Sequence, residues 1–458
     1  MQEELLSLDP ATGKEIKKYP VDADSVVKFK LANARKAFDQ WRNISIRQRS
    51  AYLKALSDYL QKHKKEMAEI ATAEMGKPYV QSVNELEKCA ETLAYYAENA
   101  SRMLQPETVE MGRHKSYVTF QPLGTVLAIM PWNFPYWQVY RAMGPILISG
   151  NSMLLKHASN VTGCALAIER SLVEAGLPEN LFQALVLPSS KVEQVISHPA
   201  VQAVTFTGST SAGAKVAATA AAHLKKQVLE LGGSDAYVVL ADADLKKAVE
   251  ICAHSRLNNT GQSCIAAKRF IVDRKIINAF EEQIKAIFES KKYGNPMDGS
   301  NQLGAMARID LRDDLHKQVE ESIQKGAKLL CGGFIPDMPG AFYPPTLLTN
   351  VRKGMPAYEE ELFGPVGVII EAKDEEDAIR IANDSEYGLG GAVFSRDIKR
   401  AEQIAAEQIE AGSVFVNDFV SSNARMPFGG IKKSGYGREL SGYGVREFVN
   451  IKAIAISE

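Results

Sequence analysis

Apolar and polar positions follow one another along this chain in a way that predicts strands and helices in repeated succession. From position 121 onward, the apolar runs GTVLAIM, SMLLK, FQALVL and AVTFTG are strand candidates. Between them, helical spacing is expected at Val161 to Ala175, Lys191 to Ser197 and Ser211 to His223. Strand and helix therefore alternate, which predicts a mostly parallel sheet covered by helices on both faces.

The alternation resumes after position 230 and predicts a second α/β lobe. The strand candidates there are the runs AYVVL, RFIVD, TLLTNV, VGVIIEA, GAVFS and SVFVND. Helical spacing spans Ile276 to Glu289, Glu375 to Asn383 and Ile398 to Gln408. The first hundred residues are mostly helical in pattern, with Asp24 to Trp41 and Ser45 to Gly76 as examples.

Length and charge narrow the classes of protein that this chain can belong to. Its 458 residues exceed what one core usually fills, so two or more lobes are expected. The 54 basic and 55 acidic side chains nearly cancel, which leaves no global field to attract nucleic acid or an anionic membrane. No apolar stretch is long enough to span a membrane, and the first residues do not form a secretory signal. We expect a cytoplasmic protein with neither a nucleic acid nor a membrane as its partner.

The cysteines are too few and too scattered to form a disulfide framework, and no metal site is predicted. They are Cys89, Cys164, Cys252, Cys264 and Cys331. An isolated cysteine is usually a small buried hydrophobe, and four of these five keep that interpretation. Cys264, in LNNTGQSCIAAKRF, poses the question of whether it is a filler or a nucleophile.

Three further stretches have both a chemical and a structural interpretation. In AVTFTGSTSAG, Gly208 and Gly213 flank the start of a helix, where backbone amides attract phosphate, although such residues also cap ordinary helices. In LELGG, Glu230 ends a strand and would project into a cleft or simply be solvated. In PWNFP, Asn133 would donate from a stiff turn or merely shape it.

Taken together and in order, these motifs resemble the NAD(P)-dependent aldehyde dehydrogenase superfamily. The segments that carry the resemblance are PWNFP, LLKHAS, FTGSTSAG, LELGG, GQSC, EELFGPV and PFGGIKKSGYGRE. It implies an α/β fold with a Rossmann-type cofactor domain, an α/β catalytic domain and a small β oligomerisation arm. The cofactor domain would comprise residues 1–102 and 122–229, the catalytic domain 230–435, and the arm 103–121 and 436–458.

The resemblance implies that Cys264 is the nucleophile, attacking an aldehyde carbon as the thiolate. The side-chain amide of Asn133 and the backbone N–H of Cys264 would hold the resulting oxyanion. Glu230 would be the general base that activates water to hydrolyse the thioester. Its presence argues against relatives that transfer the acyl group to coenzyme A and lack this glutamate.

The same matching implies a set of cofactor contacts. Lys156 would meet the adenosine ribose or its phosphate, Gly208 and Ser209 the pyrophosphate, and Glu361 the nicotinamide ribose. Trp132 would line the cleft.

One difference from the pattern of NAD-preferring relatives predicts the cofactor preference. Ser159 stands where many NAD-preferring relatives carry a glutamate that accepts the ribose 2′-hydroxyl. Without that carboxylate, Lys156, Ser159 and His157 are candidates to receive a 2′-phosphate, so NADP is predicted to be preferred over NAD.

For the substrate, the resemblance is to succinate-semialdehyde dehydrogenases. Arg141 lies where those enzymes bind the distal carboxylate, Ser421 would add a hydroxyl, and Arg425 is a second candidate. Some members carry another arginine at the position of Asn258, and that clamp is missing here.

Three functions stay open: oxidation of succinic or a similar semialdehyde such as glutaric semialdehyde, a broad or uncharged aldehyde specificity, and a noncatalytic superfamily member. In this family, strands such as KSYVTFQPLG and the closing segment pair between subunits, so a homodimer or homotetramer is expected.

Overall fold

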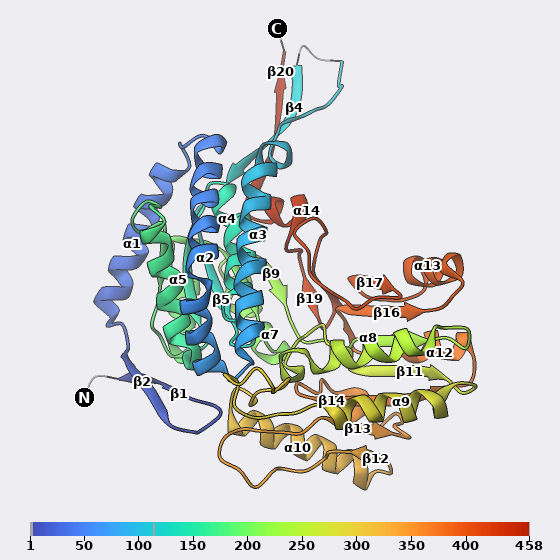
Figure 1. The fold of residues 1–458 in the computed structure, drawn as a ribbon. Helices are drawn as coiled ribbons and strands as arrows, with labels where there is room; N and C mark the ends of the chain where they lie inside the picture. The colour runs from blue at the N-terminus through green and yellow to red at the C-terminus, as the bar shows by residue number, and fades with distance from the viewer. Residues whose placement is uncertain (1–2, 113–114, 458) are drawn as a thin grey trace.

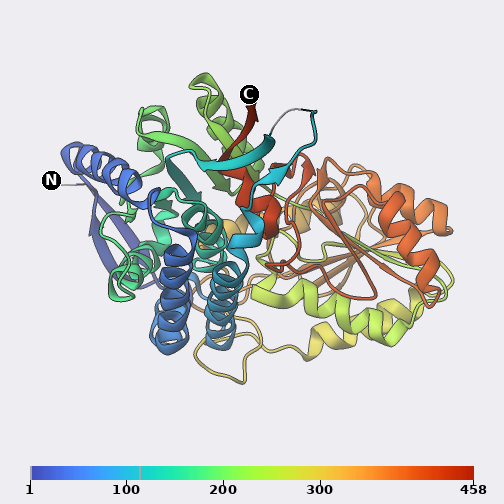
Figure 2. The same cartoon turned by 90° about the horizontal axis from the view of Figure 1, so that it is seen from above.

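The computed structural model describes residues 3–112 and 115–457, which form two α/β lobes and a projecting β arm (Figure 1). Seen from above, the helices of the first lobe (blue to green) lie beside those of the second (lime to orange) (Figure 2). Among the described residues, no helix is both long and apolar enough to cross a membrane.

The first lobe is built on a six-stranded sheet in the order β19-β9-β8-β5-β6-β7. All of its strands run parallel except β19, which pairs antiparallel with β9. Every residue of β5 and β6 is buried, which agrees with their continuous apolar runs. The strands are β5 (Thr125–Met130), β6 (Ser152–His157), β7 (Phe182–Ala184), β8 (Val201–Thr207), β9 (Lys226–Glu230) and β19 (Gly435–Tyr436).

Helices cover this sheet on both faces, as the alternation predicted. The long helix α2 begins with a capping box between Ser45 and Gln48 and ends at Gly76, whose φ of 82° is left-handed. The helices are α1 (Asp24–Trp41), α2 (Ile46–Met75), α3 (Tyr79–Met103), α4 (Trp137–Ile148), α5 (Thr162–Glu174), α6 (Val192–Ser197) and α7 (Thr210–Ala222). Two short 3-10 turns, η1 (Ser159–Val161) and η2 (Ser189–Lys191), lie among them.

The second lobe contains a seven-stranded sheet in the order β12-β13-β14-β11-β10-β16-β17. Only β12 runs antiparallel to its neighbour. The strands are β10 (Ala236–Val239), β11 (Arg269–Asp273), β12 (Lys328–Cys331), β13 (Thr346–Thr349), β14 (Val366–Ala372), β16 (Gly390–Phe394) and β17 (Ser413–Val416). The helices are α8 (Leu245–Leu257), the 3-10 turn η3 (Asn258–Gly261), α9 (Ile277–Ser290), α10 (Ile309–Gln324), α11 (Pro356–Glu359), α12 (Glu375–Asn383) and α13 (Ile398–Glu407).

The arm joins two segments that are far apart in the sequence. Strand β20 (Val449–Ile456) pairs antiparallel with β4 (Lys115–Pro122), and β3 (Glu107–Thr108) lies on the other side of β4. The two strands that were expected to need partners therefore pair with each other, and the outer side of β20 is a sheet edge. Helix α14 (Ser441–Glu447) leads into β20, and β15 (Tyr387–Gly388) pairs with β18 (Ile431–Lys432) nearby.

Two details differ from the sequence pattern. The run FQALVL forms a strand only over Phe182–Ala184, after which the backbone N–H of Leu185 donates one more bond to the carbonyl of Leu155 in β6. The hairpin of β1 (Glu4–Leu8) and β2 (Glu15–Pro20) was not predicted, because β2 is exposed along most of its length and lacks an apolar alternation. The proposed domain limits stay a prediction.

Candidate active site

The site lies where the carboxyl ends of strands in the first sheet meet the amino ends of strands in the second. Asn133 follows β5, and Glu230 is the last residue of β9. From the second sheet, Cys264 precedes β11 and Glu361 precedes β14. Open α/β sheets usually bind ligands at the carboxyl ends of their strands, and the first sheet fits that rule.

A strained loop connects the segments of Cys264 and Asn133. Asn259 and Thr260 have φ values of 56° and 53°, which non-glycine residues seldom adopt. The side-chain amide of Asn259 donates to the backbone carbonyl of Asn133 at 2.7 Å and to that of Gln262 at 3.1 Å. The Asn133 amide in turn donates to the carbonyl of Gln262 at 3.1 Å. These bonds fix the loop before Cys264 against the turn that carries Asn133.

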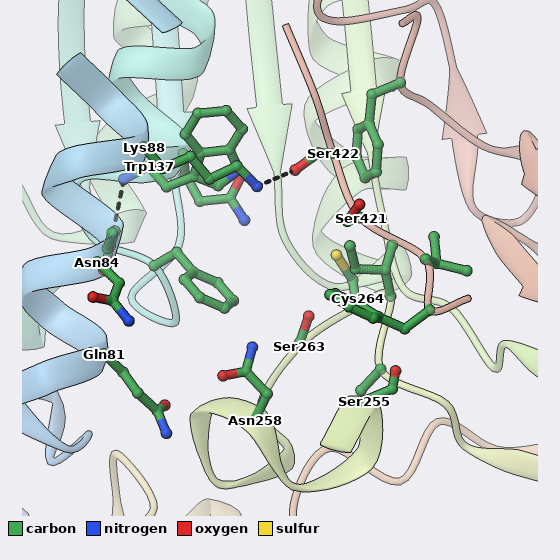
Figure 3. A pocket seen from close by; sticks show the side chains of 18 of the residues that line it. Gln81, Asn84, Lys88, Trp137, Ser255, Asn258, Ser263, Cys264, Ser421 and Ser422 are labelled. Atoms are coloured by element: carbon green, nitrogen blue, oxygen red, sulfur yellow. Dashed lines mark hydrogen bonds between the residues drawn. The ribbon is translucent and has the colours of Figure 1, made fainter. Parts of the chain in front are cut away.

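A cavity of about 310 Å³ opens beside Cys264, between helices α3 and α4 and the loops before β11 and after β17. Figure 3 shows Cys264 and Ser421 on one side of this cavity, with Lys88 and Trp137 on the opposite side. Arg141 also lines the cavity, so the structure brings both predicted substrate residues together with the thiol. Arg425 does not line it; its guanidinium lies over the Tyr95 ring, 5.2 Å from the centroid.

Arg141 is not a free cation. It is 2% exposed and forms an ion pair with Glu439, a residue that the sequence did not single out. Its guanidinium also lies 4.8 Å from the centroid of the Phe428 ring. Its Nη2 nevertheless has no hydrogen-bond partner among the described residues, which leaves a donor for a ligand.

Glu230 is buried close to the same ion pair. It is 2% exposed, and within the described chain neither carboxylate oxygen has a hydrogen-bond partner. Burial raises the pKa of Glu230 well above its usual range; the negative charge of Glu439 adds to the shift, and Arg141 opposes it. Glu230 is not among the residues that line the cavity beside Cys264.

The thiol of Cys264 is held in its protonated form by its surroundings. Burial raises the pKa of Cys264 to about 12, while the positive charges of Lys268 and Arg141 act in the opposite direction. Lys268 Nζ donates to the carbonyl oxygen of Cys264 at 2.7 Å and lies 3.3 Å from Glu361 Oε1. Lys268 was missed from the sequence, although a lysine inside the apolar run after Cys264 was a signal for it.

The predicted cofactor residues border a cationic site at the end of β6. Lys156 is 6% exposed, and its Nζ donates to Ser189 Oγ at 3.4 Å. Burial lowers the pKa of Lys156 to about 8, and in the part of the chain that the structure describes it forms no ion pair. Ser159 begins η1 two residues after β6 ends.

His157 is the last residue of β6. Its Nδ1 lies 3.0 Å from the backbone N of Ala158 and 3.1 Å from the Met130 carbonyl oxygen, and its Nε2 lies 2.9 Å from the Pro135 carbonyl oxygen. Burial lowers the pKa of His157 to about 4. Both ring nitrogens contact the backbone, and a role of His157 in receiving a phosphate stays a prediction.

The other predicted cofactor residues lie around the start of α7 and the amino end of β14. Ser209 is the N-cap of α7, and its Oγ accepts the N–H of Ala212 at 3.4 Å. A Cβ on Gly208 would lie 2.6 Å from the tip of the Phe206 ring, so a larger residue there would require the ring to shift. Glu361 accepts the N–H of Gly233 at 3.0 Å. The Trp132 ring packs edge-on against Phe363, with 5.7 Å between centroids.

Comparisons with known proteins cover nearly the whole chain. Residues 1–454 match the aldehyde dehydrogenase family. The chain is 46% identical to succinate semialdehyde dehydrogenase [NAD(P)+] Sad of Escherichia coli (strain K12) over 449 residues, covering 98% of this chain and 97% of the relative. It is 42% identical to the probable succinate-semialdehyde dehydrogenase [NADP(+)] of Synechocystis sp., covering 99% of this chain and 100% of the relative.

Solved structures give the same result. The crystal structure of succinic semialdehyde dehydrogenase from Streptococcus pyogenes in complex with NADP+ has a TM-score of 0.97 and 38% sequence identity, and the match covers 99% of this chain and 100% of that one.

Proposed function

Because this chain belongs to the aldehyde dehydrogenase family, we propose that it oxidises succinic semialdehyde to succinate with NADP as the preferred cofactor. The observation that carries the proposal is the cavity, in which the thiol of Cys264 shares a small space with a cationic side chain, Arg141, and a hydroxyl, Ser421. A short aldehyde with a terminal carboxylate needs a nucleophile at its aldehyde end and a cationic or hydroxyl group at its carboxylate end, and this cavity offers both.

Catalysis in this proposal begins when the Cys264 thiol, protonated in the resting protein, loses its proton to solvent; the thiolate then adds to the aldehyde carbon and forms a thiohemiacetal. The charge that develops on the oxygen is held by the side-chain amide of Asn133 and the backbone N–H of Cys264. In the resting geometry the Asn133 amide donates to the Gln262 carbonyl, within the loop that carries the nucleophile. Oxidation of the thiohemiacetal leaves a thioester on the sulfur, and hydrolysis of that thioester releases the acid.

Glu230 is the proposed base for the hydrolytic step. To act, its carboxyl must be deprotonated and must reach a water molecule beside the thioester. Burial keeps its pKa high, which suits a group that has to accept a proton. Among the described residues neither of its oxygens has a hydrogen-bond partner, and because Glu230 does not line the cavity in this conformation, the proposal requires the carboxyl to move toward the thioester.

The residues at the ends of β6 and β8 fit a 2′-phosphorylated dinucleotide. Lys156 would hold the 2′-phosphate, with Ser159 beside it, because the lysine has no competing carboxylate among the described residues. The helix start at Gly208 and Ser209 would hold the pyrophosphate, and Glu361 the nicotinamide ribose. When bound, the cofactor supplies the hydride acceptor.

Replacing Ser159 by glutamate is expected to move the preference toward NAD. A carboxylate there would repel a 2′-phosphate and accept a ribose hydroxyl, so the ratio of kcat/KM for NADP to that for NAD should fall by about tenfold or more. Ser159→Ala is the matched control, since it removes the hydroxyl without adding charge. An unchanged ratio in Ser159→Glu would show that this position does not select the cofactor.

The substrate is tested by initial rates of NADPH formation with succinic semialdehyde beside butyraldehyde, which has the same chain length and no carboxylate. We expect a strong preference for the acid, reduced about tenfold or more by Arg141→Ala. Equal rates for the two aldehydes would leave an aldehyde dehydrogenase of broad specificity. No reduction of either cofactor would favour the noncatalytic alternative.

We also propose a homodimer or homotetramer in the cytoplasm. The free edge of β20, where Ile451 is 59% exposed, is a surface that a second copy can cover. The five cysteines are unpaired, which agrees with a reducing compartment.

A further inference from the structure

The cavity beside Cys264 has one positive charge that forms no ion pair with any described residue. Apart from the thiol, its ionisable lining residues are Glu85, Lys88, Arg141 and His254. Arg141 is ion-paired with Glu439, and Glu85 with Lys77. Burial lowers the pKa of His254, so its ring is neutral at pH 7. Lys88 is left.

Lys88 is held in place by a hydroxyl and an aromatic ring rather than by an ion pair. Its Nζ donates to Ser422 Oγ at 2.9 Å and lies 4.2 Å from the centroid of the Trp137 ring (Figure 3). Within the described residues it forms no ion pair. An ammonium group has three donors, so two remain after the bond to Ser422. The group is thus oriented and only partly satisfied.

Lys88 and Arg141 repel one another across this part of the cavity. Both lie against Trp137, with Arg141 at 6.0 Å from the ring centroid. Burial lowers the pKa of Lys88 to about 8; the charge of Arg141 contributes to the shift, while Glu85 and Glu91 act in the opposite direction, and the amine stays mostly protonated at pH 7. Two buried cations beside the same indole are stabilised when an anion enters between them.

The geometry points to Lys88 as a specificity-determining residue that, together with Arg141, binds the carboxylate of the substrate. This inference rests on the proposed function and adds the second cation that the uncharged Asn258 does not supply. Lys88 comes from α3, on the wall opposite Cys264, so a carboxylate bound there would direct the aldehyde end toward the thiol (Figure 3). Ser422 and Trp137 act as positioning residues for the lysine.

The test compares Lys88→Met with Lys88→Arg and with Lys62→Met, which removes an exposed lysine of α2. The measured quantity is the ratio of kcat/KM for succinic semialdehyde to that for butyraldehyde. We expect Lys88→Met to lower this ratio by about thirtyfold, since a charged partner of the carboxylate is lost, while Lys88→Arg retains most of it. Lys62→Met should match the wild type.

A binding measurement separates this effect from a folding defect. 4-Hydroxybutyrate carries the carboxylate but has no aldehyde, and it should inhibit butyraldehyde oxidation competitively. Its inhibition constant is expected to rise about thirtyfold in Lys88→Met and little in Lys88→Arg.

The outcomes distinguish the two proposals. A wild-type enzyme without preference for succinic semialdehyde would contradict the proposed function. A wild-type enzyme with that preference, together with an unchanged ratio and inhibition constant in Lys88→Met, would overturn the role of Lys88 alone. If Lys88→Met does not fold, a Lys88→Arg variant that loses the preference as completely as Arg141→Ala would equally overturn it.

Discussion

Cys264→Ala is expected to abolish aldehyde oxidation, with kcat falling by about four orders of magnitude or more. The variant removes the sulfur that would form the thiohemiacetal, and no other thiol lines the cavity within the described chain. NADPH formation from succinic semialdehyde measures the loss.

Two control experiments show whether the loss is specific to the Cys264 thiol. Cys331→Ala is the matched control, because this thiol lies on β12 at the edge of the second sheet, does not line the cavity and should be dispensable. NADP titrated into Cys264→Ala should still bind, since Lys156 and the start of α7 are unaltered. Residual turnover above about a hundredth of the wild-type rate would mean that another group is the nucleophile.

Glu230→Gln is expected to stop the reaction after one turnover. The steps up to the thioester do not need this base, so one equivalent of NADPH should form rapidly per active site. The following steady-state rate should fall by about two to four orders of magnitude, because water is no longer activated.

The pH dependence adds an independent readout. The pKa of Glu230 is raised by burial and by Glu439, so its active, deprotonated form becomes populated as the pH rises. The wild-type kcat should therefore increase with pH, and the residual rate of Glu230→Gln should lose that limb. If the first turnover of Glu230→Gln slows as much as its steady-state rate, Glu230 acts in a step before the thioester forms.

Much of the fold and of the candidate site was predictable from local pattern. Short apolar runs separated by helical segments predicted β5, β8, β10, β11 and β14. Strands buried on both faces of a parallel sheet carry such continuous apolar sequence. The motif residues were predictable as a set for a related reason. Asn133 and Glu230 follow or end strands of one parallel sheet, so its topology gathers them at one edge.

The electrostatics were not predictable, because they depend on pairs that no local window contains. Arg141 was expected to be a free clamp, but Glu439, from the segment before α14, balances it. Lys88 became a candidate only when the partners of its neighbours in the cavity were known. The mutual pairing of β4 and β20 depends in the same way on where distant segments meet.

The raised pKa of Cys264 also bears on how the thiol reacts with oxidants. Hydrogen peroxide and other electrophiles attack the thiolate, and burial keeps the sulfur of the resting protein protonated at pH 7. Lys268 holds the carbonyl of Cys264 and the carboxylate of Glu361 together, so its charge is shared with that acid. We therefore expect the resting thiol to react slowly with hydrogen peroxide, and conversion to sulfinic or sulfonic acid to be slow as long as no substrate or cofactor changes its surroundings.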